Sequence, residues 1–236
     1  MKGITFNGLH SFKDLGVTIS SKEIGSPAKA KTIVKIPFSN TEYDMSELYG
    51  SQQYENRTLT YVFNIWSIAR QDKMSAEALK TRIINSYTSV NVLTPLYDDD
   101  MPGYYFMAEI REESTYTEGA NYGELTLVFT AYPFRIHTSA EGKIEWDSFN
   151  FITDTLQETE FDIDGEKSII LRNAGAVSAF PTLITDAPME ITLNGTTYSV
   201  EVGTSESLSF VLKQGENEIL IVGTGHIEFL WHKEVI

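Results

Sequence analysis

Histidine is the side chain that most often serves as a base, a metal ligand or a pH switch near neutrality. The chain has four of them, at His10, His137, His226 and His232. They show no spacing typical of a metal site, and no cysteine is present to supply a thiolate ligand. The sequence therefore favours ordinary surface or strand histidines over a catalytic or metal centre.

Two acidic clusters could offer carboxylate oxygens to a hard cation such as calcium. In the run Asp98-Asp99-Asp100, consecutive side chains of an extended chain point in opposite directions, and the alternating spacing of a calcium loop is missing. In residues 162–166, Asp-Ile-Asp-Gly-Glu, an Asp-Gly turn between two strands accounts for the same residues. We expect a solvated turn at the first cluster and a hairpin turn at the second.

Common motifs of catalytic and nucleotide-binding sites are missing from the sequence. It contains no G-x-S-x-G elbow, no phosphate loop ending in Gly-Lys-Ser/Thr and no H-E-x-x-H motif. A glycosidase with paired carboxylates stays open, because the separation of such a pair is a property of the fold. Exposed aromatics such as Trp146, Tyr198 or Trp231 could stack on sugar rings, although core packing is their commoner use. We predict no catalytic residue, no metal site and no cofactor.

Charge and composition narrow the partners. The 236 residues include 18 lysines and arginines against 33 aspartates and glutamates, a formal net charge of −15. Such a surface repels phosphate, so we expect no sequence-independent or specific nucleic-acid binding. No apolar run approaches the roughly 20 residues of a membrane span. We therefore expect synthesis in a cytoplasm without membrane insertion.

The first half of the chain combines strands with one helix. From Arg57 to Trp66, apolar and polar residues alternate with the period of two that is typical of a strand with one buried face. The following segment predicts an amphipathic helix that Ser75 caps and that presents Leu79, Ile83 and Tyr87 on one stripe. Such a helix is expected to pack on the sheet.

Further strands in this half are expected at residues 90–93, 104–110 and 123–131, with the aspartate run on the loop between the first two. Proline cannot donate to a sheet ladder, so we place a domain boundary close to Pro133.

The second half has hairpin signals and no convincing helix. Asp164-Gly165 and Asn194-Gly195 can supply the positive φ angles of tight two-residue turns. Short strands are expected at residues 208–212, 218–222 and 226–231. These features predict a β-sandwich of about 100 residues.

Five segments form an ordered series of motifs. Residues 6–17 contain an aromatic-x-Gly stretch, a serine and Asp-Leu-Gly; residues 31–38 end in Ile-Pro-Phe; residues 54–63 begin with tyrosine and arginine before a strand. Residues 172–181 contain Asn-x-Gly and a later proline, and residues 213–219 contain Gly-x-Asn-x-Ile. In this order the motifs resemble those of siphophage distal tail proteins, the Dit family, over nearly the whole chain. Many members have a Gly-x-x-Gly loop where this chain has Phe-Ser-Asn-Thr, after Ile-Pro.

The resemblance implies a mainly β fold in two domains. Residues 1–133 would form an α+β, ring-forming domain, a β-sandwich with one α-helix and a hairpin, and residues 134–236 a galectin-like all-β sandwich. The chain would be a structural virion protein without enzymatic activity or cofactor, from a phage or prophage of a Gram-positive host.

The resemblance also implies partners and a place in the virion. The protein would form a homo-hexameric ring at the distal end of the tail after synthesis in the host bacterial cytoplasm. The ring would join the tail tube protein to the tail-associated fibre or lysin protein and, in some phages, to a receptor-binding protein. The alternative is a carbohydrate-binding module, in which the second sandwich grips a host-surface glycan; a wall hydrolase ranks third.

Overall fold

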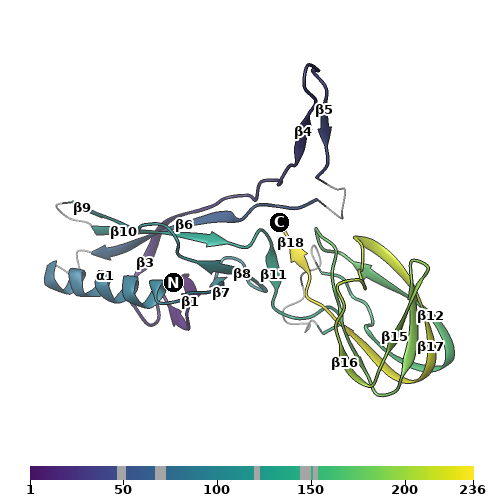
Figure 1. Cartoon of the computed structure of the whole chain (residues 1–236). Helices are drawn as coiled ribbons and strands as arrows, with labels where there is room; N and C mark the ends of the chain where they lie inside the picture. Colours follow the sequence, from purple (N-terminus) through teal and green to yellow (C-terminus); the bar gives the residue numbers. More distant parts are fainter. Residues whose placement is uncertain (47–51, 67–72, 120–122, 144–149, 151–153) are drawn as a thin grey trace. The chain divides into compact units, whose positions relative to one another are not determined.

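The computed structural model describes residues 1–46, 52–66, 73–119, 123–143, 150 and 154–236. Within these residues the chain is mainly β with one helix, which confirms the predicted fold class. It divides into two compact units, Met1–Arg135 with Ile236, and Ile136–Val235 (Figure 1). Among the described residues, no helix has the length and apolar character needed to span a bilayer.

The strands and the helix follow one another in two groups. The first group is β1 (Ile4–Phe6), β2 (Leu9–His10), β3 (Thr18–Ile24), β4 (Ile33–Lys35), β5 (Glu42–Asp44), β6 (Arg57–Trp66), α1 (Lys73–Thr88), β7 (Thr94–Asp98), β8 (Tyr104–Glu109), β9 (Thr115–Glu118) and β10 (Gly123–Ala131). The second group is β11 (Arg135–His137), β12 (Glu160–Asn173), β13 (Thr182–Thr185), β14 (Met189–Leu193), β15 (Thr196–Val200), β16 (Gly203–Ser205), β17 (Gly215–Leu230) and β18 (Glu234–Val235).

The main sheet of the first unit folds over into two layers. Its strand order is β2-β1-β7-β8-β10-β6-β3, with β9 beside β10. β6 and β10 pair along their whole lengths, whereas β8 meets β10 at only two residue pairs. β1 lies against β10 across the core, where Phe6 packs edge to face on Phe129 with ring centroids 5.1 Å apart.

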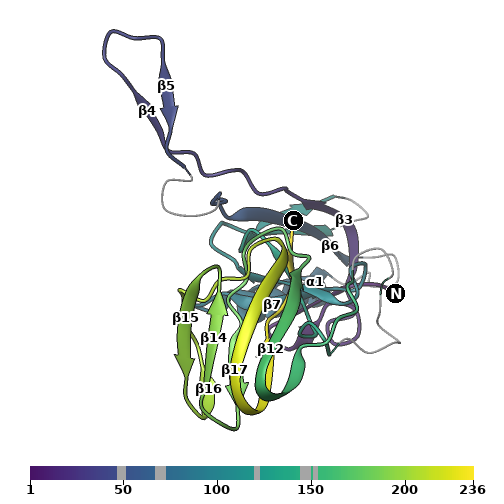
Figure 2. The ribbon, with the colours of Figure 1, turned by 90° about the vertical axis from the view of Figure 1, so that its right-hand side faces the viewer.

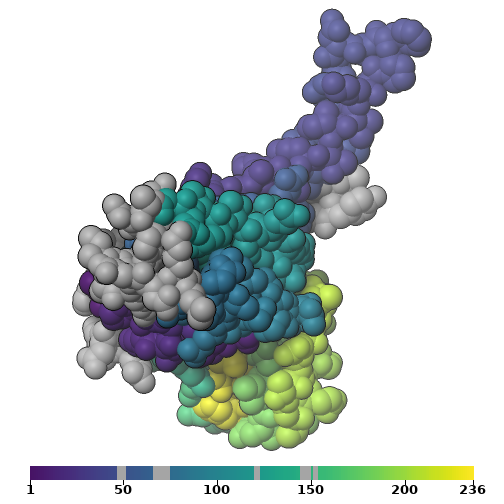
Figure 3. Space-filling view, turned by 90° about the vertical axis from the view of Figure 1, so that its left-hand side faces the viewer, coloured from purple at the N-terminus to yellow at the C-terminus, as the bar shows by residue number. Residues whose placement is uncertain are grey.

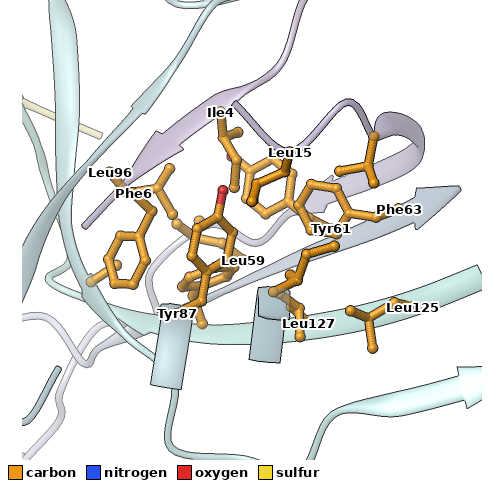
Figure 4. Close-up of a cluster of buried hydrophobic side chains, with 14 of the residues drawn as sticks. Ile4, Phe6, Leu15, Leu59, Tyr61, Phe63, Tyr87, Leu96, Leu125 and Leu127 are labelled. Carbon is orange, nitrogen blue, oxygen red and sulfur yellow. The ribbon is translucent and has the colours of Figure 1, made fainter. Parts of the chain in front are cut away.

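Alternating residues and one helix fill the space between the layers. On β6 the predicted inward residues, from Leu59 to Ile65, are all buried. Tyr87 of α1 packs against Phe6 with centroids 5.6 Å apart, and Ile83 is buried on the same stripe. Figure 4 shows side chains of β1, β6, β10 and α1 converging on this cluster. Each large apolar side chain buried there contributes about 1.5–3 kcal/mol of transfer free energy.

Two details of the first half differ from the sequence prediction. Lys73 is already helical, so Ser75 lies inside α1 and does not cap it. The strand expected at residues 90–93 lies instead at Thr94–Asp98. Pairing fixes that register, because Asp98 lies opposite Ile4 of β1 and Tyr97 lies opposite Tyr105 of β8. The first of the three aspartates therefore belongs to the sheet and not to a loop.

A long two-stranded ribbon organises the second unit. All 14 residues of β12 pair with β17, and Figure 2 shows the two strands side by side. On its other edge β17 pairs first with β14 and then with β13. One half of the ribbon thus joins β14 and β15, and the other half joins β13 and β16. The apolar residues enclosed between them, among them Phe210 and Phe229, form a second core.

Glycines let this ribbon bend between its halves. Gly165 of β12, with φ 87°, lies opposite Gly223 of β17, with φ 157°, and Gly225 follows with φ 148°. A Cβ atom on Gly225 would lie 2.8 Å from the Cβ atom of Ala187, so no side chain fits there. The predicted hairpin turn at Asp164-Gly165 is therefore wrong, because the pair marks a bend inside one continuous strand.

Other turns and strands of the second unit are mixed in outcome. Asn194-Gly195 forms the predicted turn between β14 and β15, with φ angles of 51° and 80°. The strands predicted at 218–222 and 226–231 merge into β17 up to Leu230. Residues 208–212 do not form the predicted strand and contain one isolated bridge, between Leu212 and Ala179.

Candidate functional site

The segment that carries β4 and β5 is an exposed feature of the first unit. We call residues 28–46 the arm. β4 and β5 pair with each other in a sheet of their own, and every residue of both strands is exposed. Figures 1 and 2 show the arm projecting from the main sheet, and Figure 3 shows it open to solvent on the side in view. The bridge between Lys29 and Tyr54 marks its base.

The arm gathers large apolar side chains without burying them. Phe38 is fully exposed. Its backbone φ angle is 62°, a value that residues other than glycine and asparagine rarely adopt. A two-stranded hairpin alone is marginally stable in water, and grouped exposed apolar residues mark interaction surfaces. The large apolar residues exposed on the arm are Ile33, Val34, Ile36, Phe38, Tyr43 and Met45.

Charge also sets the arm apart from the rest of the chain. It has three lysines and two carboxylates, a net charge of +1, so the other residues together carry −16. Lys31 pairs across the hairpin with Asp44 at 2.7 Å, and Lys35 pairs with Glu42 at 3.1 Å. The bonds from Lys31 and then Ser46 lower the pKa of Asp44. A nearly neutral, apolar arm is therefore suited to lie against an acidic surface.

Asp98 is buried at the end of β7 and is fully engaged within the first unit. Both its oxygens accept hydrogen bonds from Lys22 Nζ, at 2.8 and 3.0 Å, and the Tyr61 hydroxyl donates to Oδ2 at 2.9 Å. Burial, and then the nearby Asp98 carboxylate, raise the pKa of Tyr61. The contact between Asp98 and Tyr61 was not predicted from the sequence. Its one sign in the sequence is that Tyr61, among the inward-facing residues of β6, carries a polar hydroxyl.

The next two aspartates also have basic partners. Asp99 accepts from His10 Nε2 and from the Gly3 amide, each at 3.0 Å. Asp100 accepts from both Lys2 and Lys22 at 2.6 Å, and these bonds lower its pKa to about 2. Ammonium and imidazole groups thus occupy the positions that a cation would take. The predicted solvated turn is wrong for Asp98, because its carboxylate is buried and bonded to Lys22 and Tyr61.

No protein-family model matches the chain, and no curated protein matches it in sequence. The crystal structure of SPP1 Dit, described as a paradigm of the hub adsorption apparatus in phages that infect Gram-positive bacteria, matches with a TM-score of 0.67 at 12% identity. The match covers 100% of both chains. The chain has the fold of SPP1 Dit.

A second solved structure, the phage p2 baseplate in its activated conformation with Sr, has a TM-score of 0.39. Its identity is 11% over 99% of this chain and 96% of that chain, and such a score is too low to define a shared fold.

His10 bonds to Asp99, as described above. The other three histidines also form structural contacts. His137 is buried, with Nε2 3.8 Å from Asp154, and His232 donates from Nδ1 to the carbonyl of His137 at 2.9 Å. His226 pairs with Asp162 across the ribbon at 2.9 Å, and this bond raises the pKa of His226. In the described part of the chain, no group of three or more histidine, aspartate or glutamate side chains is arranged to hold a metal ion.

The aromatics considered for sugar stacking do not form a platform in the described residues. Trp231 is 4% exposed and belongs to the second core, which is the commoner use expected for such an aromatic. Tyr198 is half-buried against the second core and donates its hydroxyl to the carbonyl of Ser209 at 2.8 Å. Trp146 lies outside the described residues.

Proposed function

We propose that this chain is a structural, non-enzymatic protein of a phage tail, and that six copies form a ring at the distal end of the tail. The observation that carries the proposal is the match to SPP1 Dit, a hub protein of the adsorption apparatus, over the full length of both chains. The ring would join the tail tube protein to the tail-associated fibre or lysin protein, and in some phages to a receptor-binding protein. The protein would be made in the cytoplasm of a Gram-positive host.

The two parts of the chain would divide this work. Residues 1–133 would supply the ring, because the arm and the two-layered sheet belong to them. Residues 134–236, as a galectin-like sandwich, would present a surface to other tail proteins.

The arm supports ring formation. A closed ring needs a head-to-tail contact, in which one surface of a subunit meets a different surface of its neighbour. The arm offers exposed apolar side chains and a net charge of +1, while the remaining surface is strongly acidic. In the ring, the arm of each subunit would lie against the acidic body of the next, where its apolar side chains become buried.

The ion pairs formed by the three consecutive aspartates support a structural role. Asp98, Asp99 and Asp100, one of the two acidic clusters that could have offered oxygens to a cation, are bonded to lysines and to a histidine. These contacts fasten the N-terminal segment and β3 to the end of β7.

Substitution at the tip of the arm tests the proposal. Phe38→Ser removes an apolar side chain that assembly would bury, which is worth about 2 kcal/mol, or roughly a 30-fold weaker contact. Light scattering at rising concentration should show assembly of the wild type, and of Phe38→Ser only at much higher concentration.

The matched control is Leu208→Ser, because Leu208 is 84% exposed but lies in the second unit. It should assemble as the wild type does. At a concentration too low for assembly, both variants should melt at the wild-type temperature, because Phe38 and Leu208 are exposed in the single chain. Equal assembly of Phe38→Ser and the wild type would contradict the assigned interface.

A further inference from the structure

Four ionisable side chains are buried together inside the second unit. The side chains of Asp154 and Lys233 are each 1% exposed, that of His137 is 2% exposed, and Glu141 is 1% exposed. We call these four residues the latch. Charged groups are rarely buried unless each has a partner of opposite charge.

The latch fastens the beginning of the second unit to its end. The amide of His137 donates to the carbonyl of Lys233, and the amide of Glu141 donates to the carbonyl of Trp231, both at 2.9 Å. Lys233 Nζ donates to Asp154 Oδ1 at 2.7 Å. Residues 137–141, Asp154 and residues 231–233 are therefore held together by one polar cluster.

With a neutral His137, the charges in the latch do not balance when both carboxyl groups are ionised. Lys233 is the single lysine and is bonded to Asp154. Glu141 Oε2 accepts from Gln157 Nε2 at 3.0 Å, but Glu141 Oε1 is buried and has no hydrogen-bond partner among the described residues. A buried carboxylate oxygen without a donor is costly. Protonation of Glu141 removes this excess negative charge.

Gln157 cannot turn to serve the unpartnered oxygen without giving up other bonds. Its Nε2 also donates to the carbonyl of Arg172 at 2.8 Å, and its Oε1 accepts from the amide of Arg172 at 2.9 Å. The side-chain amide of Gln157 is thus held by the main chain of β12, and Glu141 Oε1 stays without a hydrogen-bond donor among the described residues.

We propose that Glu141 makes the latch respond to pH. The latch is closed most firmly when Glu141 carries a proton, and ionisation of Glu141 loosens the junction between residues 137–141 and 231–233. This inference does not rest on the proposed function, because every group in it lies within the second unit.

The direction of the response follows from the groups that face Glu141. Burial raises the pKa of Glu141 above its ordinary value of 4.5; Gln157, Lys233 and His137 lower it, Asp154 raises it further, and the balance is upward. A carboxyl group whose pKa is raised by folding stabilises the fold fully below its ordinary pKa. That contribution is lost as the pH rises through the raised value.

Asp154 acts in the opposite sense. Burial would raise its pKa, but the bonds from Lys233 and from the Asn150 amide lower it on balance from 3.8. Its contribution is present above that ordinary value and is lost as the pH falls through the lowered value. The latch is therefore strongest in mildly acidic solution, between these two transitions.

Hydrogen exchange of the full chain measures the latch directly, because the amides of His137 and Glu141 are bonded across the junction. After correction for the intrinsic exchange rate, their protection in the wild type should fall about tenfold or more from about pH 5 to about pH 8. In Glu141→Gln it should stay nearly constant over this range. Glu158→Gln is the matched control, since Glu158 is exposed on a neighbouring segment, and it should follow the wild type.

Two results would overturn the inference. One is a parallel loss of protection in Glu141→Gln and in the wild type. The other is a loss that disappears in His137→Gln but persists in Glu141→Gln, which would assign the response to the histidine. If Glu141→Gln does not fold, the carboxyl carbon of Glu141 can be titrated by NMR in the wild type. A midpoint above that of the exposed glutamates supports the proposal, and an equal midpoint contradicts it.

Discussion

Replacing Asp98 by alanine should destabilise the first unit by about 3 kcal/mol, because it removes one partner of a buried ion pair. The carboxylate accepts four hydrogen bonds, two from Lys22 and one each from the Tyr61 hydroxyl and the Asp100 amide. Breaking a buried pair typically costs about 3–5 kcal/mol. We place the effect at the low end because Lys22 is 25% exposed and keeps its bond to Asp100.

Urea denaturation followed by circular dichroism measures this effect. Asp100→Ala is the matched control, since Asp100 is a neighbouring carboxylate with a 40% exposed side chain. Its loss of stability should be much smaller than that of Asp98→Ala. Part of the loss in Asp98→Ala comes from the Tyr61 hydroxyl, which is left buried without an acceptor. Tyr61→Phe should therefore cost less in the Asp98→Ala background than in the wild type.

Calcium offers the opposing explanation of the same aspartates. If they formed a calcium site, calcium would raise the melting temperature of the wild type by mass action. Such a rise, or equal effects of Asp98→Ala and Asp100→Ala, would refute the assignment of Asp98 as a buried structural anion.

Two further predictions concern the ribbon and the charge of the proposed ring. In thermal melts, Gly225→Ala should destabilise the second unit by more than Gly195→Ala. Both glycines have a positive φ, but of the two only Gly225 is crowded, since Asp186 Oδ1 would lie 2.4 Å from the added Cβ. Equal destabilisation by the two variants would contradict this reason. In the proposed ring, six copies would carry 6 × −15 = −90 formal charges, so we expect a neutral or acidic lumen. The assembled protein should not retard duplex DNA in a gel at about 50 mM salt, and salt-sensitive binding would oppose this inference.

Local patterns were sufficient where one face of an element meets the core. β6 and β10 lie where the alternation predicted them, because each alternate side chain is buried in the first core. The stripe of α1 was also predicted, since Ile83 and Tyr87 are buried on it. Asn194-Gly195 specifies its turn through its own backbone preferences.

Long-range pairing decided what the sequence alone did not reveal. Asp164-Gly165 has the same local signal as a hairpin turn, but pairing with a 16-residue strand keeps it within β12. Asp98 meets Lys22 across 76 positions of sequence, so no local pattern marks it as buried. The arm has the apolar residues of a buried strand, and its exposure is seen only in the structure, so its role as a contact surface is part of the proposal.

We propose that the protein assembles into a ring of six subunits, and native mass measurement combined with negative-stain imaging of the purified chain is the decisive test. A hexamer of this 26.5 kDa chain has a mass of 6 × 26.5 = 159 kDa, and we expect this species together with closed rings that have a central hole. A strict monomer at the highest concentration and low salt, with no rings in the images, would rule out ring assembly.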